Sequence, residues 1–418
     1  MQVDFFLAQT LDSIVRKIAT DLPHFGSDFE PNVRTADPRF GDFQINGVLA
    51  HAKQLKQNPR ALGQELLDAL NASGAFDPEA TTLSLAGPGF INIELSAPFL
   101  LRWLKTFSSA QAIRQAAQSA CAGQTVVVDY SAPNTAKEMH VGHIRSTVIG
   151  EAIARIVQFA GAQTIRDNHI GDWGTQFGMI IYAIKQSGYD LDLEHENPIA
   201  DLEQLYKEGN AAYKASDEIA TRVRAELVKL QNGDPENVAL WNKITQVSWT
   251  AFSKVYDLLG IQFDEVLGES YYRDQVEDIY RELENAGIAE ESQGALVVFH
   301  PEHKRFATQP FIIRKTDGAS NYASTDLATI RHRINHFKAD EILYVVDSRQ
   351  SDHFEQLFIT AQKWFDQQLA KLPKLNHISF GTVLGENGKP LKTKEGNNIK
   401  LRALLDEAID RSFAIVSE

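Results

Sequence analysis

The stretch that decides the fold is TVVVDYSAPNTAKEMHVGHIRSTVIGEAIARIVQFAGAQTIRDNHIGDWGTQFGMIIYAIKQSG, residues 125–188. It opens with a run of β-branched residues, which predicts a short buried strand, and passes through a loop into a helical pattern from about His140 to Ala160. A second strand and turn at 163–171 and a second helix over 174–188 follow. This order of strand, loop, helix, strand and helix is typical of the start of a doubly wound parallel sheet.

Two later segments extend the predicted sheet. EILYVVD (341–347) predicts a third parallel strand, with a helix after it over 351–365, and HISFGTVLG (377–385) predicts another strand. Residues from about 185 to 260 are charged and helical in pattern, which indicates an insertion between the halves of the sheet. Apolar segments between 295 and 337 are expected to resume the core. The predicted fold class is therefore α/β, with a Rossmann-type doubly wound parallel sheet and a helical insertion.

The residues before the sheet predict a separate small α+β domain over 1–112. Its pattern combines amphipathic helices, two short strands around a Gly-Pro-Gly turn and a third helix over about 97–120. The catalytic domain is expected to occupy 113–405, and 406–418 to begin a further, truncated helical region. A chain of 418 residues has room for two or more domains.

Composition narrows the class of protein. The chain is 43% hydrophobic and 23% charged, which is ordinary for a soluble globular protein, and it has no apolar run long enough to cross a membrane. Its 41 basic and 55 acidic side chains give a formal charge of −14, so a nucleic acid would have to meet local basic surfaces. The single cysteine, Cys121, favours a reducing compartment and argues against a zinc ribbon. We therefore expect a cytoplasmic protein.

The first chemical motif is the run His140-Val141-Gly142-His143, placed between a strand and a helix. Histidines three apart at a helix start face the same way, and the unpaired amides of the first turn favour an anion such as phosphate. Gly142 leaves room for a nucleotide to come close. A bare pattern of this kind more often marks two structurally satisfied histidines, and it is the strand–loop–helix context that favours phosphate binding. A metal site is less favoured, since neither HExxH nor a nearby third ligand occurs.

Longer stretches carry a resemblance to a known family. DYSAPNTAKEMHVGHIRSTVIGEAIARI (129–156) resembles the signature of class I aminoacyl-tRNA synthetases in the form that arginyl-tRNA synthetases have. DNHIGDWGTQFGMII (167–181) resembles a second arginyl signature. Further blocks are similar to the family in the right order: FGDFQINGVLAHAKQLKQNPR (40–60), AGPGFINIELS (86–96), LGIQFDEVLGESYY (259–272), NYASTDLA (321–328), VVDSRQSDHFEQ (345–356) and HISFGTVLGENGKPLKTKEGN (377–397).

The resemblance implies an arginine–tRNA ligase, which uses ATP to convert L-arginine to arginyl-adenylate and then charges tRNA(Arg). The side chains implied to stabilise charge on the phosphates, with help from Mg²⁺, are His140, His143, Lys137, Lys392 and Lys394. The implied ATP contacts are His140, Gly142, His143 and Lys392. Lys392 and Lys394 lie where the family has its KMSKS loop, here in degenerate form, and Lys137 is implied to compensate. An ordinary solvated charge remains the alternative for each lysine.

The same resemblance implies a site for free arginine. Paired carboxylates suit its planar guanidinium, and the implied side chains at that end are Glu269, Tyr322 and Asp326. The implied ligands of the α-amino end are Asp129, Asn134 and Gln350. Asp129 is one methylene shorter than the glutamate expected at that position. Structural alternatives stay open for most of these residues: a helix-cap acid, a loop acid, a turn residue or an N-cap neighbour.

Several further expectations follow from the comparison with this family. GDWGTQFG (171–178) could give structural support or contact a ligand. In the first domain, four basic residues could meet the outer corner of tRNA or form a solvated face: Arg34, Lys53, Lys56 and Arg60. The family's helical anticodon-binding domain is absent, so we expect a truncated form that charges tRNA poorly, and a monomer. The rival interpretations are a non-catalytic or regulatory tRNA-binding relative and another HxGH nucleotidyltransferase.

Overall fold

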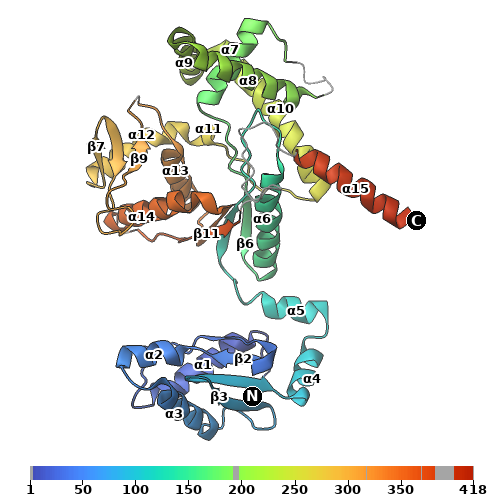
Figure 1. Ribbon diagram of the computed structural model, residues 1–418, viewed down its shortest axis with the longest axis vertical. Helices are drawn as coiled ribbons and strands as arrows, with labels where there is room; N and C mark the ends of the chain where they lie inside the picture. Colours follow the sequence, from blue (N-terminus) through green and yellow to red (C-terminus); the bar gives the residue numbers. More distant parts are fainter. Residues whose placement is uncertain (1–2, 192–196, 317, 369, 382–399, 418) are drawn as a thin grey trace. The chain divides into compact units, whose positions relative to one another are not determined.

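The structure of the protein is a computed structural model (Figure 1). It describes the whole chain except residues 1–2, 192–196, 317, 369, 382–399 and 418. The chain divides into two compact units, Met1–Ala120 and Cys121–Glu418, so the division falls shortly after the boundary expected at 112. Each unit has hydrophobic clusters of its own, and they are described separately below.

The first unit is an α+β domain built on one antiparallel sheet with the strand order β1-β2-β4-β3. Its strands are β1 (Val33–Thr35), β2 (Phe43–Ile45), β3 (Thr81–Ala86) and β4 (Phe90–Leu95). Its first three helices are α1 (Leu7–Thr20), α2 (Gly47–Leu55) and α3 (Pro59–Ala72). Leu11, Val15, Leu66 and Ile93 are fully buried in the shared core, as the amphipathic spacing predicts.

The helix expected over about 97–120 is instead two helices, α4 (Ala97–Thr106) and α5 (Ala110–Ala117). The break has a local cause, since the Ser109 side chain accepts a hydrogen bond from the Ala112 amide at 3.1 Å and caps a new helix. Phe107, at the end of α4, packs against Phe5 and Trp103. Hydroxyl capping and aromatic packing therefore override the helical apolar spacing at this point.

The second unit is built around a four-stranded parallel sheet with the order β11-β10-β5-β6, which confirms the predicted fold class. The strands are β5 (Thr125–Asp129), β6 (Gln163–Asp167), β10 (Glu341–Asp347) and β11 (Lys374–Phe380). Side chains alternate between the two faces of the sheet. Val127 and Ile342 join a core with α13 (Tyr322–Asn335) and α14 (Ser351–Gln367), whereas Val128 and Val345 pack on the side of α6 (Val141–Phe159).

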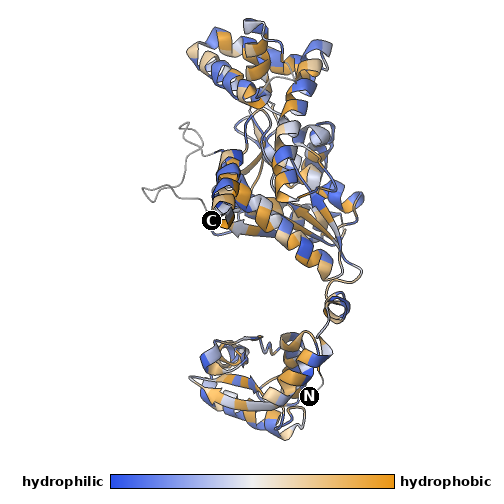
Figure 2. Ribbon diagram, turned by 90° about the vertical axis from the view of Figure 1, so that its right-hand side faces the viewer, coloured by the Kyte–Doolittle hydropathy of each residue, from blue (hydrophilic) through white to orange (hydrophobic). Residues whose placement is uncertain are grey.

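The predicted insertion is a bundle of helices that follows β6. The expected range holds α8 (Pro198–Ala215), α9 (Asp217–Gln231) and α10 (Pro235–Leu259). Helix α7 (Thr175–Ser187), expected as part of the doubly wound core, packs with these helices instead, in a hydrophobic cluster that includes Phe177, Leu202 and Ile244. These helices, at the top of Figure 2, carry hydrophobic and hydrophilic residues along their length, as amphipathic helices do.

The segments expected to resume the core between 295 and 337 do so in part outside the parallel sheet. Strands β7 (Ala289–Ser292), β8 (Ala295–Val298) and β9 (Phe311–Arg314) form a separate antiparallel sheet. Their apolar side chains still pack into the same cluster as α12 (Val276–Asn285) and α13. A two-residue turn joins β7 to β8, and residues 299–310 connect β8 to β9, so each pair can align antiparallel. A strand pattern alone does not distinguish this from parallel pairing.

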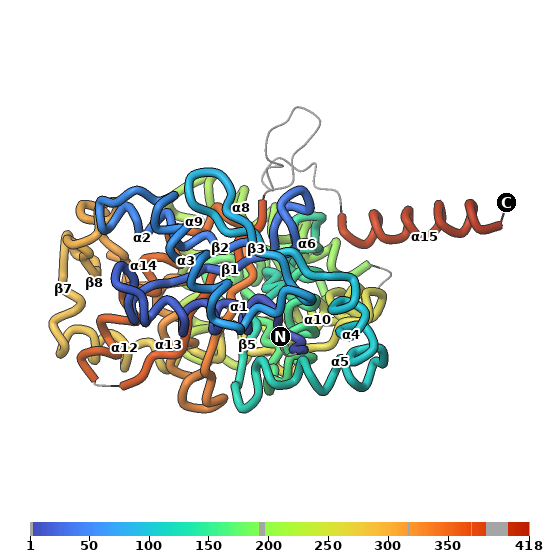
Figure 3. Tube along the Cα trace, turned by 90° about the horizontal axis from the view of Figure 1, so that it is seen from below, coloured from blue at the N-terminus to red at the C-terminus, as the bar shows by residue number. Residues whose placement is uncertain are grey.

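The last described helix, α15 (Leu401–Ser417), contacts α6 near its start. Its distal half extends away from the rest of the second unit (Figure 3) and exposes apolar side chains, with Phe413 74% and Val416 86% accessible. None of the helices in the described part of the chain is long and apolar enough to cross a membrane.

Candidate active site

The carboxyl edge of the parallel sheet gathers three aspartates, because Asp129, Asp167 and Asp347 each end a strand. A cavity of about 400 Å³ opens at this edge. Several residues singled out in the sequence line it together: Asn134, His140, Gly142, His143 and Gln350. Open α/β sheets bind ligands at this edge, so the cavity is the candidate site.

The two histidines of the HVGH run are fixed at the start of α6 by backbone hydrogen bonds. The His140 Nδ1 accepts from the Gly142 amide at 3.0 Å, and the His143 Nδ1 accepts from the His140 amide at 3.0 Å. Their rings stack with centroids 3.9 Å apart. Because each Nδ1 is an acceptor, the remaining proton of each neutral ring lies on Nε2, which is left as a donor.

Burial keeps both histidines uncharged at neutral pH. It lowers the pKa of His143 to about 3, and it lowers the pKa of His140 with help from the nearby charges of Arg349 and Lys137. Gly142 is required by this packing, since a Cβ there would lie 2.8 Å from the His140 ring. The site therefore presents neutral hydrogen-bond donors beside the positive end of a helix, which suits an anionic ligand.

Two arginines that the sequence patterns did not single out also line the cavity. The guanidinium of Arg349 bonds to Asp347 at 2.9 Å, and that of Arg145 donates to the carbonyl of Gly381. Arg349 directly precedes Gln350, and Arg145 lies in the first turns of α6. Together with the helix start they give the cavity positive charge on two sides, although the whole chain is acidic.

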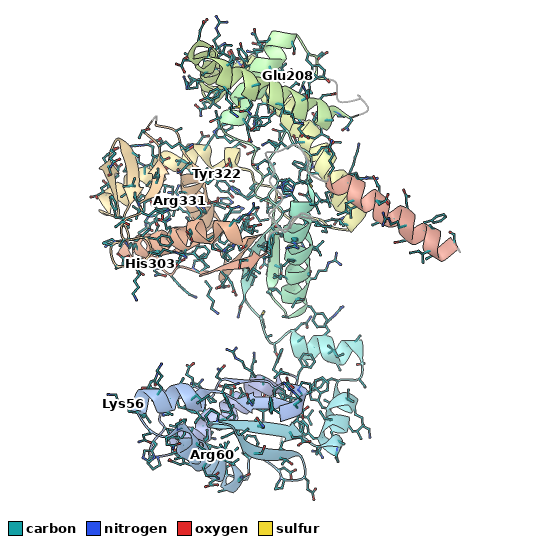
Figure 4. The ribbon with its side chains drawn as sticks, viewed as in Figure 1. Lys56, Arg60, Glu208, His303, Tyr322 and Arg331 are labelled. Atoms are coloured by element: carbon teal, nitrogen blue, oxygen red, sulfur yellow. The ribbon has the colours of Figure 1, made fainter. Side chains whose placement is uncertain are left out.

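A second group of site residues forms an acidic cluster outside the lining of this cavity. Glu269 begins the short helix α11 (Glu269–Tyr272), and Asp326 lies in the second turn of α13. Asp326 accepts a hydrogen bond from the His353 Nε2 at 2.6 Å. Tyr322, labelled in Figure 4 at the start of α13, is 66% exposed, and its pKa is raised by partial desolvation and by the charges of Glu269 and Asp326.

Within this acidic cluster, the carboxyl group whose pKa is most strongly shifted is that of Glu269. Its pKa is raised to about 7, chiefly because burial disfavours the charged form, and also because Asp326 and Asp172 repel it. His169, whose pKa is raised by the surrounding carboxylates, partly offsets this effect. An acidic cluster in which a carboxyl group has a raised pKa is suited to a cationic ligand, because the cation would stabilise the carboxylate form.

Asp129 is committed to a buried ion pair. Arg333, fully buried in α13, donates to the Asp129 Oδ2 at 2.7 Å and to the Asp167 Oδ2 at 2.7 and 2.9 Å. The one buried guanidinium offsets the desolvation cost of the two acidic side chains, and it holds both carboxylates in fixed orientations. Asp129, at the end of β5, is only 6% exposed, and one of its carboxylate oxygens accepts a hydrogen bond from Arg333.

The lysines predicted to neutralise phosphate are either near the histidines but not among the residues that line the cavity, or outside the described residues. The Lys137 ammonium lies 4.3 Å from the ring centroid of Tyr206 in α8, a cation–π contact with the helical insertion. Lys392 and Lys394 fall in 382–399, outside the part of the chain that the structure describes. Their contribution stays a prediction.

Comparison with known proteins agrees with both the fold and the sequence motifs. Residues 108–418 match the family described as tRNA synthetases class I (R), catalytic domain, and residues 6–95 match the arginyl tRNA synthetase N terminal domain. The chain belongs to the arginyl-tRNA synthetase family. The resemblance inferred from the HVGH and GDWGTQFG blocks is thereby confirmed.

Curated arginyl-tRNA synthetases resemble the chain over nearly its whole length. The arginine–tRNA ligase of Erwinia tasmaniensis is 42% identical over 94% of this chain and 67% of its own, and that of Streptomyces avermitilis is 40% identical over 96% and 68%. The arginine–tRNA ligase of Chromobacterium violaceum is 41% identical, and 65% of its length is covered. The chain thus spans about two thirds of the length of these relatives.

Two solved structures have the same fold. The arginyl-tRNA synthetase of Plasmodium falciparum is 26% identical, with a TM-score of 0.71 over 98% of this chain and 68% of that one. The Thermus thermophilus enzyme, 23% identical with a TM-score of 0.72 over 99% and 71%, shows the likeness of the fold alone. The sheet, the helical insertion and the N-terminal unit are therefore features of arginyl-tRNA synthetases.

Sequence reasoning missed several residues that complete the site. His353 lies in the first turn of α14 and three residues after Gln350, a spacing that could have placed both near the same edge. Arg333 gave no such signal, because its partner Asp129 is 204 residues away in the chain. His169, whose Nδ1 lies 2.9 Å from the Leu267 carbonyl oxygen, belongs to the arginyl signature whose chemistry the sequence left open.

Proposed function

We propose that this chain catalyses the activation of L-arginine by ATP, the first step of arginyl-tRNA formation, as an arginine–tRNA ligase. The observation that carries the proposal is the presence of two unlike groups of side chains in the second unit. One is a cavity lined by neutral histidine donors, arginines and a helix start, and the other is the acidic cluster of Glu269 and Asp326. An anionic phosphate and a cationic side chain would be bound side by side, as this reaction requires.

In the proposed reaction the carboxylate of arginine attacks the α-phosphate of ATP, a new C–O–P linkage forms, and pyrophosphate leaves. The protein has no covalent role in this step. His140 and His143 would donate from Nε2 to phosphate oxygens as charge builds up, and Arg145 and Arg349 would add positive charge at the cavity. Lys137, Lys392 and Lys394 are proposed to join them when ATP is bound.

The bound arginine is proposed to lie between two sets of side chains. Glu269 and Asp326 would hold the guanidinium, with Tyr322 at the rim. Asp129, Asn134 and Gln350 would meet the α-amino end, and Asn134 and Gln350 already line the cavity. The Arg333 ion pair fixes the orientation of the Asp129 carboxyl, because the buried guanidinium is also held by Asp167.

Mg²⁺ is proposed only as the ion that accompanies ATP. Among the residues that the structure describes, no group of three or more histidine, cysteine, aspartate or glutamate side chains could hold a metal ion. The donors at the cavity are mainly arginine, histidine and amide groups, which suit phosphate rather than a divalent cation. No step of the proposed reaction is therefore assigned to an ion bound by the protein alone.

The second step, transfer of arginine to tRNA(Arg), is also a proposal for this chain. In the first unit, Lys56 caps the end of α2 and Arg60 lies in the first turn of α3, as Figure 4 shows. With Arg34 and Lys53 they are proposed to contact tRNA through its phosphates. A cytoplasmic location, a monomeric state and slow charging of tRNA are likewise proposals for this chain, which spans about two thirds of the length of its relatives.

The test of the proposed function is ATP–pyrophosphate exchange with each standard amino acid, with and without tRNA. We expect exchange that depends on arginine alone, strongest with tRNA present, and slow aminoacylation by this chain. If arginine gives no exchange with tRNA, and a version extended to the length of the curated relatives is equally silent, the proposal is wrong. Exchange that depends on a different amino acid would also contradict it.

Arginine binding is predicted to depend on pH through Glu269. Its pKa of about 7 means that the free protein carries a protonated Glu269 below this pH, whereas the guanidinium prefers the carboxylate. Binding therefore requires loss of a proton at low pH, and the dissociation constant should rise by up to about tenfold for each pH unit below 7. Isothermal titration calorimetry of L-arginine across this range measures the effect.

The matched control for this prediction is Glu269→Gln, which keeps the shape of the side chain but cannot ionise. Its affinity should be low at every pH, with a much flatter profile between about pH 6 and 8. Any pH dependence of the affinity that remains in the variant would report on His169, whose pKa is raised by the surrounding carboxylates. A wild-type affinity that does not change across this range would contradict the assignment of Glu269.

A further inference from the structure

The arginyl signature DNHIGDWGTQFG contains a loop whose role the sequence left open between structural support and ligand contact. We refer to residues 168–173 as the central loop. It follows β6 directly and ends before α7. On one side it pairs with the segment that carries Asn134, and on the other with the segment that carries Glu269.

The first side of the central loop is joined to residues 132–135 by the backbone. The Gly171 amide donates to the Pro133 carbonyl at 3.1 Å, and the Gly171 carbonyl accepts from the Thr135 amide at 3.0 Å. This pairing puts Gly171 directly beside Asn134. A Cβ on Gly171 would lie 2.1 Å from the Asn134 Oδ1, so any side chain there would displace the Asn134 amide.

The second side of the central loop is joined to residues 268–270. The Ile170 carbonyl accepts from the Glu269 amide at 3.1 Å. The Asp172 carboxylate accepts twice from Ser270, at 2.8 Å from its amide and at 2.6 Å from its hydroxyl. Gly268 has no room for a side chain, because a Cβ there would lie 2.4 Å from the Asp172 carboxylate.

We propose that the central loop sets the distance between the two ends of the arginine site, with Gly171 and Asp172 as positioning residues. Gly171 holds Asn134 at the α-amino end, and the adjacent Ile170 and Asp172 hold the start of α11, with Glu269, at the guanidinium end. This inference rests on the proposed function, since it assumes that Asn134 and Glu269 bind the same arginine molecule.

Neighbouring residues of one short loop thus carry the anchor points of both ends of the site. Each side has backbone hydrogen bonds, and the one side chain that adds to them, Asp172, is only 5% exposed, so the spacing cannot relax by rotation of an exposed side chain. A site with a fixed spacing between polar groups rejects ligands whose charged ends lie at another distance, because unpaired polar groups are costly. The central loop would thereby select the length of the amino acid as well as hold its ligands.

The first test is a double-mutant cycle between Gly171 and Asn134, with arginine and ATP affinities measured by calorimetry on the full chain. Gly171→Ala should weaken arginine binding by roughly tenfold or more while ATP affinity changes little. Asn134→Ala should also weaken it. In the double variant the two closest atoms are gone and the next is the Asn134 Cα at 3.5 Å, an ordinary contact, so the second change should add almost nothing.

The matched control is Gly26→Ala, where a Cβ meets nothing within 4 Å. It should leave arginine affinity and melting temperature unchanged. Wild-type arginine affinity in Gly171→Ala would overturn the inference, and so would losses that simply add in the double variant. A Gly171→Ala protein that fails to fold, while the double variant is folded, would still locate the clash at Asn134.

The second test uses arginine analogues one methylene longer or shorter. Asp172→Ala should lower the preference for arginine over homoarginine and norarginine by roughly tenfold, whereas Ser270→Ala, which loses only the hydroxyl contact, should lower it less. If the wild-type chain binds no arginine, the proposed function fails. If it binds arginine and Asp172→Ala keeps both affinity and preference, only the role of the central loop fails.

Discussion

Asp326→Asn is expected to weaken arginine binding by about two orders of magnitude, because a carboxylate that is only 17% exposed and would pair with a cation is replaced by a neutral amide. The amide keeps the volume of the side chain, so the pocket is not emptied. Its Nδ2 hydrogens would face the guanidinium hydrogens, and the 2.6 Å bond from the His353 Nε2 would lose its charged acceptor. Calorimetry with L-arginine measures the loss directly.

The control for this variant is Asp274→Asn, which removes the same charge near α11 from a carboxylate that is 86% exposed. It should leave arginine affinity nearly unchanged, because exposed charges are screened. ATP affinity should be preserved in both variants, since neither residue lines the cavity at the start of α6. An Asp326→Asn protein that binds arginine as well as the wild type would remove Asp326 from the pocket.

His140→Asn is expected to slow formation of the adenylate by about a hundredfold, the usual cost of losing one donor aimed at developing charge. Asparagine is chosen because its side-chain oxygen can accept from the Gly142 amide as the His140 Nδ1 does at 3.0 Å. The cap of α6 is thereby kept, while the Nε2 donor is lost. The rate of ATP–pyrophosphate exchange at saturating arginine measures the effect.

His140→Ala separates the two roles of this side chain. It should lose the same catalytic rate, and in addition about 1 kcal/mol of stability through the lost helix cap. Thermal melting should therefore distinguish alanine from asparagine, whereas the exchange rate should not. An asparagine variant that keeps the full exchange rate would show that His140 acts only as a cap.

The parallel sheet could be predicted from the sequence because its signals are local. Every second residue of TVVVD faces the same side of the sheet, and the structure divides Val127 from Val128 between two cores in that way. The separation of β7–β9 into their own sheet could not be predicted, because strand patterns do not state which partner a strand takes. The break between α4 and α5 rests on one serine cap.

The same distinction between local and non-local signals applies to the candidate site. The fixed histidines could be expected from a motif that lies in one turn of a helix, where spacing determines direction. The partners of the acids could not, since the pairing of Asp129 with Arg333 joins residues 204 positions apart. The contact of Lys137 with Tyr206 likewise depends on how the insertion packs, which no local pattern encodes.

The central strand of the sheet imposes an order on folding during synthesis. β5 pairs with β10, and the Thr125 amide bonds to Asp340, 215 residues later in the chain. During synthesis, this strand therefore cannot complete its pairing until most of the second unit has been made. The first unit, whose hydrophobic cluster runs only from Leu11 to Phe99, can be complete long before. The catalytic edge would thus be the last part of the chain to become native, because its non-local contacts pay the largest loop-closure cost.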